Sequence, residues 1–202
     1  MNPLELIAAS QVAAKEAGDG NGRFCQLATV GEDGNPRVRT VIMHDVTEVH
    51  IGCVFSVYHN KFRHLEANGR FQVYVWHATQ GNQFMVNGVY ESMPHARLQR
   101  YWDEFLGKRS KHLDLFYTTE ANRRPAETFA DRESLEAEYW AHVKDLEDRN
   151  DPLEMPDHVV GAHFVAQQVE HLKVSDSDGR FHHRSVYELG ADGTWTHSVL
   201  VP

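Results

Sequence analysis

The chain has 202 residues, a length typical of one domain or of one domain with an insertion. Its 20 Lys and Arg residues are outnumbered by 29 Asp and Glu residues, which gives a formal net charge of −9. Such an acidic balance argues against general binding to nucleic acids, although it does not exclude a local basic pocket.

The N-terminal region does not read as a signal peptide, because Glu5 interrupts its apolar run. No apolar run approaches the roughly 18 residues that a membrane-spanning helix needs. Cys25 and Cys53 lie in apolar, strand-like segments, which is typical of reduced core thiols. We therefore expect a cytoplasmic protein with no membrane partner.

Periodicity and turn residues predict the elements in chain order. Apolar residues at helical spacing indicate helices over residues 3–17, 61–68 and 134–146, and a further helix that opens at Pro94. Alternation and β-branched residues between Gly-containing turns indicate strands over residues 24–30, 36–44, 49–54, 71–76, 83–93, 159–169, 172–174, 181–189 and 195–201. The predicted turn at residues 31–36 makes a hairpin of the first two strands.

This order of elements predicts a mainly β protein with helices, of the α+β class. Because tight turns join most neighbouring strands, the sheet should be antiparallel, and its short strands favour a closed or nearly closed barrel. Residues 107–157 are polar and partly helical, so we expect them to form an insertion that lies outside the barrel or at a dimer contact. The whole chain, residues 1–202, is then a single domain.

Basic residues stand at unexpected places in this barrel. Arg37 and Arg39 share one face of a predicted strand, where a guanidinium needs either water or an anionic partner. Lys61 stands at the start of a helix, and Arg180, His182 and Arg184 alternate along a late strand. These positions suggest an anion site such as a phosphate, and the alternative is a set of solvated strand faces.

Other chemistries find less support in the sequence. No two histidines have the i, i+4 spacing of a zinc enzyme with a Glu between them, and no cysteine cluster accompanies the histidines, so no metal site is expected. The chain also lacks a G-x-S-x-G elbow, a G-x-G-x-x-G fingerprint and a Walker-type loop. A serine hydrolase with this motif and a nucleotide site of the Rossmann or P-loop type are therefore disfavoured.

The ordered set of motifs resembles the pyridoxamine 5′-phosphate oxidases and the wider FMN-binding split-barrel group. The segment of residues 24–30 with its Gly turn is similar to the family's A-T-V-x-x-x-G-x-P hairpin, and residues 39–44 are similar to its R-x-V-x-x-K strand. Further similarities lie at Asn60-Lys61, Gln83 to Gly88, Tyr101-Trp102, Arg180 to Arg184 and Trp195 to Pro202. The resemblance covers most of the chain except residues 106–160.

The resemblance implies an antiparallel split β-barrel that binds FMN at a homodimer interface and oxidises a small, pyridoxal-type substrate. It places Arg180 and His182 at the substrate as catalytic residues, and it adds His44 and Tyr101 to the substrate-binding residues. It also implies a set of FMN-binding residues, in which Arg39 and Lys61 hold the phosphate and Gln83 the polar edge of the flavin ring: Arg39, Thr40, Val41, Ile42, Met43, His44, Phe55, Asn60, Lys61, Gln83 and Arg184.

Several positions depart from the family pattern. His44 replaces a Lys, Asn60 replaces an Arg, and Phe105 stands where an Arg helps to clamp the substrate phosphate. The anchors for FMN are thus better kept than the clamp for a substrate phosphate, which is a pattern of a divergent branch of the family. Two alternatives stay open: an FMN-dependent reductase with a nicotinamide or deazaflavin donor, and a flavin-binding protein without catalytic activity.

Overall fold

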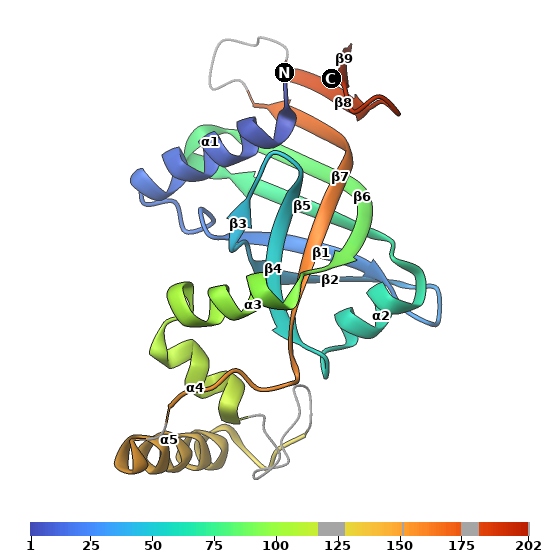
Figure 1. Cartoon of the computed structure of the whole chain (residues 1–202). Helices are drawn as coiled ribbons and strands as arrows, with labels where there is room; N and C mark the ends of the chain where they lie inside the picture. Colours follow the sequence, from blue (N-terminus) through green and yellow to red (C-terminus); the bar gives the residue numbers. More distant parts are fainter. Residues whose placement is uncertain (117–127, 151, 175–181, 202) are drawn as a thin grey trace. The chain divides into compact units, whose positions relative to one another are not determined.

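The computed structural model describes residues 1–116, 128–150, 152–174 and 182–201 (Figure 1). The chain divides into two compact units. The first comprises residues 1–54, 64–92 and 162–202, and the second comprises residues 55–63 and 93–161. The single domain expected from the sequence stays a prediction.

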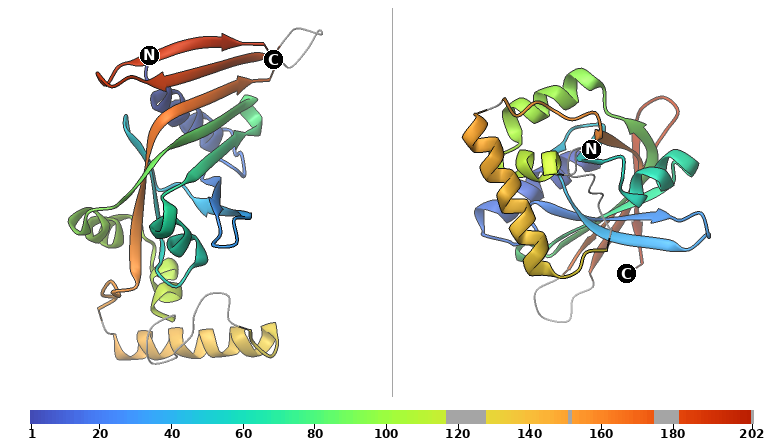
Figure 2. Two further views of the ribbon diagram at one scale, coloured as in Figure 1. Left: turned by 90° about the vertical axis from the view of Figure 1, so that its right-hand side faces the viewer. Right: turned by 90° about the horizontal axis from the view of Figure 1, so that it is seen from below.

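An antiparallel sheet forms the framework of the fold. Its strands among the described residues are β1 (Phe24–Val30), β2 (Pro36–Ile42), β3 (Asp45–Val46), β4 (His50–Ser56), β5 (Phe71–His77), β6 (Asn82–Ser92), β7 (Val159–Lys173), β8 (His183–Leu189) and β9 (Trp195–Leu200). The main path runs β2-β1-β5-β6-β7-β4-β3, and β8 and β9 extend from β7. Figures 1 and 2 show that the strands curl into a half-barrel, which confirms the predicted split-barrel class.

Alternation along the strands separates a buried face from a half-exposed face. In β5, every second residue from Phe71 to His77 is buried, and the residues between them are partly exposed. The first helix, α1 (Pro3–Glu16), contacts the sheet at β3 and β5 and buries Leu4 and Ile7 completely. The core of the first unit is made of these fully buried apolar side chains: Leu4, Ile7, Cys25, Leu27, Ile51, Cys53, Val73, Val75, Val86, Phe164 and Val169.

Buried positions also explain the two cysteines. Cys25 lies on β1 and Cys53 on β4, and both are buried thiols as expected from their apolar surroundings.

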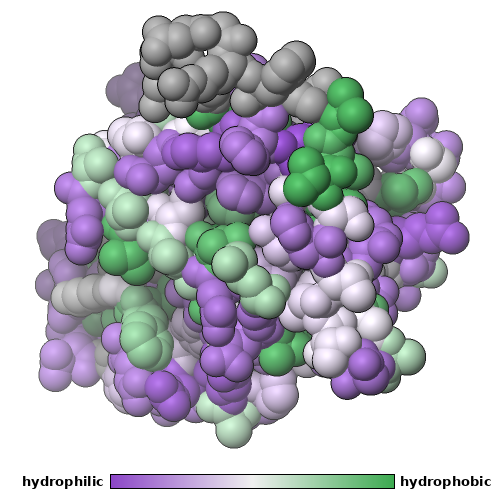
Figure 3. Space-filling view, turned by 90° about the horizontal axis from the view of Figure 1, so that it is seen from above, coloured by the Kyte–Doolittle hydropathy of each residue, from purple (hydrophilic) through white to green (hydrophobic). Residues whose placement is uncertain are grey.

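Other apolar side chains reach the surface, among them Val38 on β2 and Val199 on β9. In the view of Figure 3, hydrophobic side chains form separate groups between hydrophilic ones.

Helices dominate the second unit: α3 (His95–Arg100) continues into a π-helical turn (Tyr101–Phe105), and α4 (Lys108–Phe116) and α5 (Arg132–Arg149) follow. Trp102 is almost fully buried, and its indole Nε1 donates a hydrogen bond to the Leu153 carbonyl at 2.6 Å. The Phe116 ring packs edge-on against Tyr139 of α5, with 5.6 Å between centroids. The first contact therefore ties the π-helical turn to the segment at Leu153, and the second joins α4 to α5.

Some boundaries differ from those that the sequence suggested, for local reasons. The helix expected over residues 134–146 begins earlier, because the Asp131 side chain accepts a hydrogen bond from the Ser134 N–H at 2.7 Å. It ends where Asn150 turns left-handed with φ 52°, so the helix is also longer at its C-terminal end than expected. The short strand expected at residues 172–174 is instead the end of β7. The strand expected at 181–189 is β8, which begins at His183.

Gly88 of β6 lies too close to the neighbouring strand to carry a side chain, so its substitution tests the packing of the sheet. A Cβ on Gly88 would lie 1.9 Å from the Val165 carbonyl oxygen, a backbone atom of the neighbouring strand, next to an irregularity in the register. We predict that Gly88→Ala lowers the free energy of unfolding by about 2 kcal/mol or more, measured by urea denaturation. Gly20→Ala is the control, since a Cβ at Gly20 meets no atom within 4 Å. Equal stability of the two variants would contradict this view of the strand contact.

Candidate functional site

The Arg39 side chain lies on the buried face of β2. It pairs across the sheet with Leu27 of β1, and directly paired residues of antiparallel strands point to the same side. Leu27 is fully buried, whereas Arg39 is half-buried because β2 is the edge strand of the main path. The Arg39 Nη1 donates to the Leu27 carbonyl at 2.9 Å and to the Thr29 hydroxyl at 2.7 Å. The guanidinium is thus fixed at the rim of the core by two neutral acceptors.

The remaining donors of Arg39 are on its outer edge. A guanidinium carries five N–H donors, and the two on Nη1 are used by Leu27 and Thr29. Among the described residues, no carboxylate pairs with Arg39. Burial, and then the charge of Arg37, lower the pKa of the Arg39 guanidinium. Its Nε–Nη2 edge therefore has the geometry and the uncompensated charge to bind an anion through two parallel hydrogen bonds.

Backbone groups of the same strand are exposed next to Arg39. The Met43 N–H donates to the Arg23 carbonyl at 2.9 Å, which sets the hydrogen-bonding phase of the β1–β2 pair. In this phase, the peptide groups of Thr40 and Ile42 point away from β1, toward the open edge of β2. A flat ligand along this edge would meet backbone donors and acceptors.

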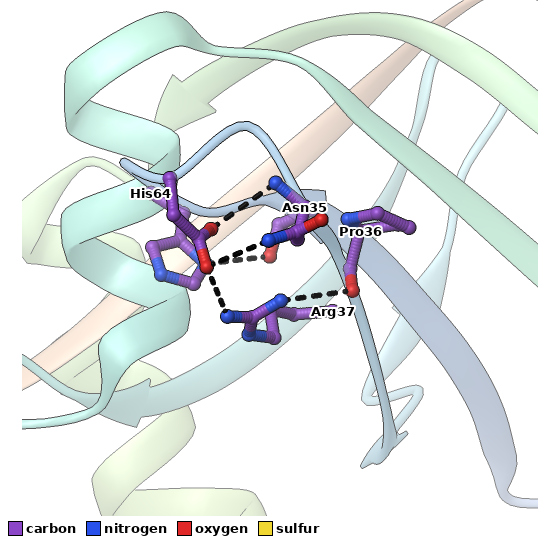
Figure 4. Close-up of polar contacts among 6 residues, drawn as sticks. Asn35, Pro36, Arg37 and His64 are labelled. Atoms are coloured by element: carbon purple, nitrogen blue, oxygen red, sulfur yellow. Dashed lines mark hydrogen bonds and ion pairs between the residues drawn. The ribbon is translucent and has the colours of Figure 1, made fainter.

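The neighbouring Arg37 has a different environment. It is exposed and forms an ion pair with Asp33 at 2.6 Å within the β1–β2 turn. Figure 4 shows this turn with Asn35, Pro36 and Arg37, and with His64 of α2 (Asn60–Asn68) beside it. Hydrogen bonds from Asn35, and then the Arg37 contact, lower the pKa of Asp33 to about 2. The charge of Arg37 is therefore matched within the turn, unlike that of Arg39.

Gln83 and Arg184 lie on the opposite face of the sheet. The register places Trp76, Gln83, Leu172 and Arg184 in one row across β5, β6, β7 and β8, on the half-exposed face. The Tyr74 hydroxyl donates to the Gln83 Oε1 at 3.2 Å. Arg184 donates to Glu170 at 2.7 Å, and this hydrogen bond raises the pKa of Arg184.

His44 follows β2 and faces a buried environment. Its N–H donates to the Gly52 carbonyl at 2.9 Å, and the neighbouring Met43 is only 3% exposed. Burial lowers the pKa of His44, and the charge of Arg23 adds to this effect while Asp45 opposes it. His44 is therefore neutral at pH 7 and does not replace the positive charge of a lysine at this position.

The second unit contains the other predicted ligands. The Lys61 ammonium lies over the Phe55 ring, 5.1 Å from its centroid, at the first turn of α2. The Asn60 side chain accepts a hydrogen bond from Arg63 at 2.7 Å. Tyr101 is buried in the π-helical turn, with its ring 5.3 Å from that of Phe105. Phe105 itself is 60% exposed, so an apolar ring occupies the surface position where the resemblance expects a cation.

The predicted residues therefore fall into separate groups. Arg39 and Val41 share the inner face of β2, while Gln83 and Arg184 share the outer face of the sheet. His182 precedes β8 and is exposed, and Arg180 lies outside the described residues. The alternation expected for Arg180, His182 and Arg184 along one strand thus reaches only Arg184 within β8.

Two residues next to Arg39 were not identified from the sequence. Thr29 is only 2% exposed and bonds both Arg39 and the His64 Nδ1. The sequence contains a signal for Thr29, because this polar residue stands at the next buried position of the strand after Cys25 and Leu27. No local pattern marks His64, since its contact with Thr29 joins residues far apart in the chain.

Two further absences concern the described part of the chain only. Residues 1–116, 128–150, 152–174 and 182–201 contain no group of three or more His, Cys, Asp or Glu side chains that could hold a metal ion. Within the same ranges, no helix combines the length and the apolar character needed to cross a lipid bilayer.

Comparisons with known proteins show which sequences this chain is similar to. Residues 7–94 match the family model described as "Pyridoxamine 5′-phosphate oxidase, FMN-binding domain". A pyridoxine/pyridoxamine 5′-phosphate oxidase of Alkalilimnicola ehrlichii is 28% identical over 178 residues, which cover 88% of this chain and 85% of that protein. One from Myxococcus xanthus is 27% identical over 205 residues, with 100% and 92% coverage.

Solved structures share the fold. PhzG from Burkholderia lata, in complex with tetrahydrophenazine-1-carboxylic acid, has a TM-score of 0.81 at 20% identity, covering 100% of this chain and 93% of PhzG. A pyridoxamine 5′-phosphate oxidase-related, FMN-binding protein from Nostoc punctiforme has a TM-score of 0.75 at 15% identity, covering 98% and 96%. The resemblance stated from the sequence is confirmed by these matches.

Three histidines with lowered pKa values predict how stability depends on pH. Burial lowers the pKa of His44, His77 and His171, so these side chains stay neutral in the folded chain while the unfolded chain takes up protons near pH 6.5. Their contribution is complete above that value and is lost as the pH falls. Between pH 7.5 and 6, the free energy of unfolding should decrease by at most about 0.8 kcal/mol for each histidine that stays neutral.

Urea denaturation at the two pH values measures this change. His77→Gln should show a smaller decrease, because His77 is fully buried and is bonded through its Nδ1 to Ser10 at 2.8 Å. A parent protein that is equally stable or more stable at pH 6 would contradict the assignment.

Proposed function

We propose, on the premise that this chain is a relative of the pyridoxamine 5′-phosphate oxidase-like FMN-binding split-barrel proteins, that it binds FMN and acts as an oxidoreductase. The observation that carries the proposal is the Nε–Nη2 edge of Arg39, which has no protein partner among the described residues. A phosphate offers two oxygens at the spacing of that edge and supplies the negative charge that the half-buried guanidinium lacks.

Other predicted ligands suit other parts of the same cofactor. The open peptide groups of Thr40 and Ile42 can bond the polar atoms of a flat ring. When bound, FMN supplies two-electron chemistry, which neighbouring hydrogen-bond donors and positive charges tune. The assignments of Gln83, Arg184, Lys61, Phe55 and Asn60 to FMN rest on the resemblance and are part of the proposal.

The two faces of the sheet support the proposal that the chain forms a homodimer. Arg39 faces inward on β2, whereas Gln83 faces outward on β6, three strand spacings or about 14 Å away along the sheet. One flavin that contacts both sets is most simply shared by two copies of the chain. The half-exposed face carries the large side chains Tyr74, Trp76 and Met85, which suit a contact with a second copy.

The substrate is proposed to be a small molecule of the pyridoxal type, held by Arg180, His182 and Tyr101. Two findings disfavour a strong grip on a substrate phosphate: His44 is half-buried with a lowered pKa and is neutral, and Phe105 is an exposed apolar ring. The enzyme should therefore discriminate weakly between substrates with and without a 5′-phosphate. The proposed place of action is the cytoplasm.

The phosphate assignment of Arg39 predicts a selective loss of affinity. Arg39→Ala should weaken FMN binding about 30-fold, equivalent to about 2 kcal/mol, because a charge-assisted pair is lost. Binding of riboflavin, which has no phosphate, should change little. Titration with fluorescence detection measures both affinities. Arg37→Ala is the matched control, because Arg37 is exposed and already paired with Asp33. Unchanged FMN affinity in Arg39→Ala would refute the assignment.

The substrate assignment of Arg180 and His182 predicts a different result. Arg180→Ala and His182→Ala should keep the yellow flavin and should lower turnover by at least about 100-fold, the effect typical of lost catalytic groups. Anaerobic bleaching of the flavin by pyridoxamine or its 5′-phosphate, without a nicotinamide donor, measures the reaction. Loss of flavin from the variants would instead assign both residues to cofactor binding. Bleaching of the parent only by a nicotinamide or deazaflavin donor would identify a reductase.

A further inference from the structure

Thr29 connects Arg39 to a second element of the fold. Its side chain lies on the buried face of β1, with Oγ1 at 2.7 Å from the Arg39 Nη1 and at 2.9 Å from the His64 Nδ1. The three side chains come from β2, β1 and α2, and all three belong to the first unit. Thr29 therefore bridges Arg39 and the helix.

Hydrogen-bond chemistry fixes the direction of the contact between Arg39 and Thr29, and the tautomer of His64 sets the direction of the second contact. A guanidinium can only donate, so the Thr29 oxygen uses a lone pair to accept from Arg39. Its own hydrogen is then available for the His64 Nδ1, which accepts it when the ring carries its proton on Nε2. His64 thereby orients the Thr29 hydroxyl, and the hydroxyl presents its lone pair to Arg39.

The packing of His64 supports a fixed orientation of its ring. The ring lies beside the β1–β2 turn (Figure 4), and a Cβ on Gly31 would be 3.7 Å from the His64 Nε2. Four residues further along α2, the Asn68 amide donates to the Val30 carbonyl at 3.4 Å. Two contacts one helical turn apart therefore tie α2 to the end of β1, next to Thr29.

We propose that Thr29 and His64 are positioning residues that hold the Nη1 edge of Arg39, so that its Nε–Nη2 edge is presented to the phosphate of the flavin nucleotide. The inference rests on the proposed function and adds two residues to it. Neither residue touches the anion. Both act by restricting the rotation of a long side chain that would otherwise lose conformational entropy on binding.

The experiment compares FMN and riboflavin as probes of the full-length chain after removal of bound flavin. Thr29→Val, which keeps the shape but removes the hydroxyl, should weaken FMN binding about tenfold and leave riboflavin binding within twofold. Thr29→Ser should restore FMN binding to within twofold of the parent. His64→Leu should weaken FMN binding several-fold in the same selective way. Thr196→Val is the control, because Thr196 lies on β9, donates to the Glu188 carbonyl of β8 and should change neither affinity when substituted.

The ratio of the two affinities separates positioning from damage to the fold. Equal losses for FMN and riboflavin in Thr29→Val, or FMN binding as tight as in the parent, would overturn the positioning pair while the proposed function stands. If Thr29→Val does not fold, the selective loss in His64→Leu decides in its place, and its absence overturns the inference. A parent protein that binds neither compound would overturn the proposed function and this inference together.

Discussion

The half-buried guanidinium of Arg39 is the constraint on which the candidate site depends. An arginine in the middle of a sheet that faces a hydrophobic core would carry an uncompensated charge away from water. Arg39 avoids this penalty because β2 is an edge strand, so only one side of its side chain is enclosed by Leu27 and Thr29. The enclosed side is satisfied by neutral acceptors. The other side keeps the charge available, which is the condition for binding an anion without losing the stability of the barrel.

On the outer face of the same sheet, polar side chains form hydrogen bonds with one another. Gln72 donates to Asn87, Asn87 to Gln168, and Gln168 to Glu188, so a row of hydrogen bonds crosses four strands. Glu170 binds Arg184 one row away. Because these groups satisfy one another, the face can be covered by a second copy of the chain without leaving unpaired polar groups. Its half-exposed aromatic residues then supply the apolar contact area of the proposed dimer.

Local patterns predicted much of this fold from the sequence, because the strands are short and alternate clearly between their turns. The hairpin of residues 24–30 and 36–44 and the helix that opens at Pro94 could be predicted in this way. Contacts between distant residues could not be predicted, and these determine the site. The charge of Arg184 is matched by Glu170, and the hydroxyl of Thr29 is bonded to His64, 35 residues away. The neutral state of His44 likewise comes from burial, which no sequence spacing reveals.

The central claim is that a flavin phosphate binds at Arg39 in a site shared by two chains. Native mass spectrometry of the full-length chain with FMN tests it most directly. The expected particle contains two chains and two FMN molecules, and the dimer formed by Arg39→Ala should carry markedly less FMN at the same concentration. A monomer that retains FMN, or a dimer whose FMN content is unaffected by Arg39→Ala, would contradict the claim.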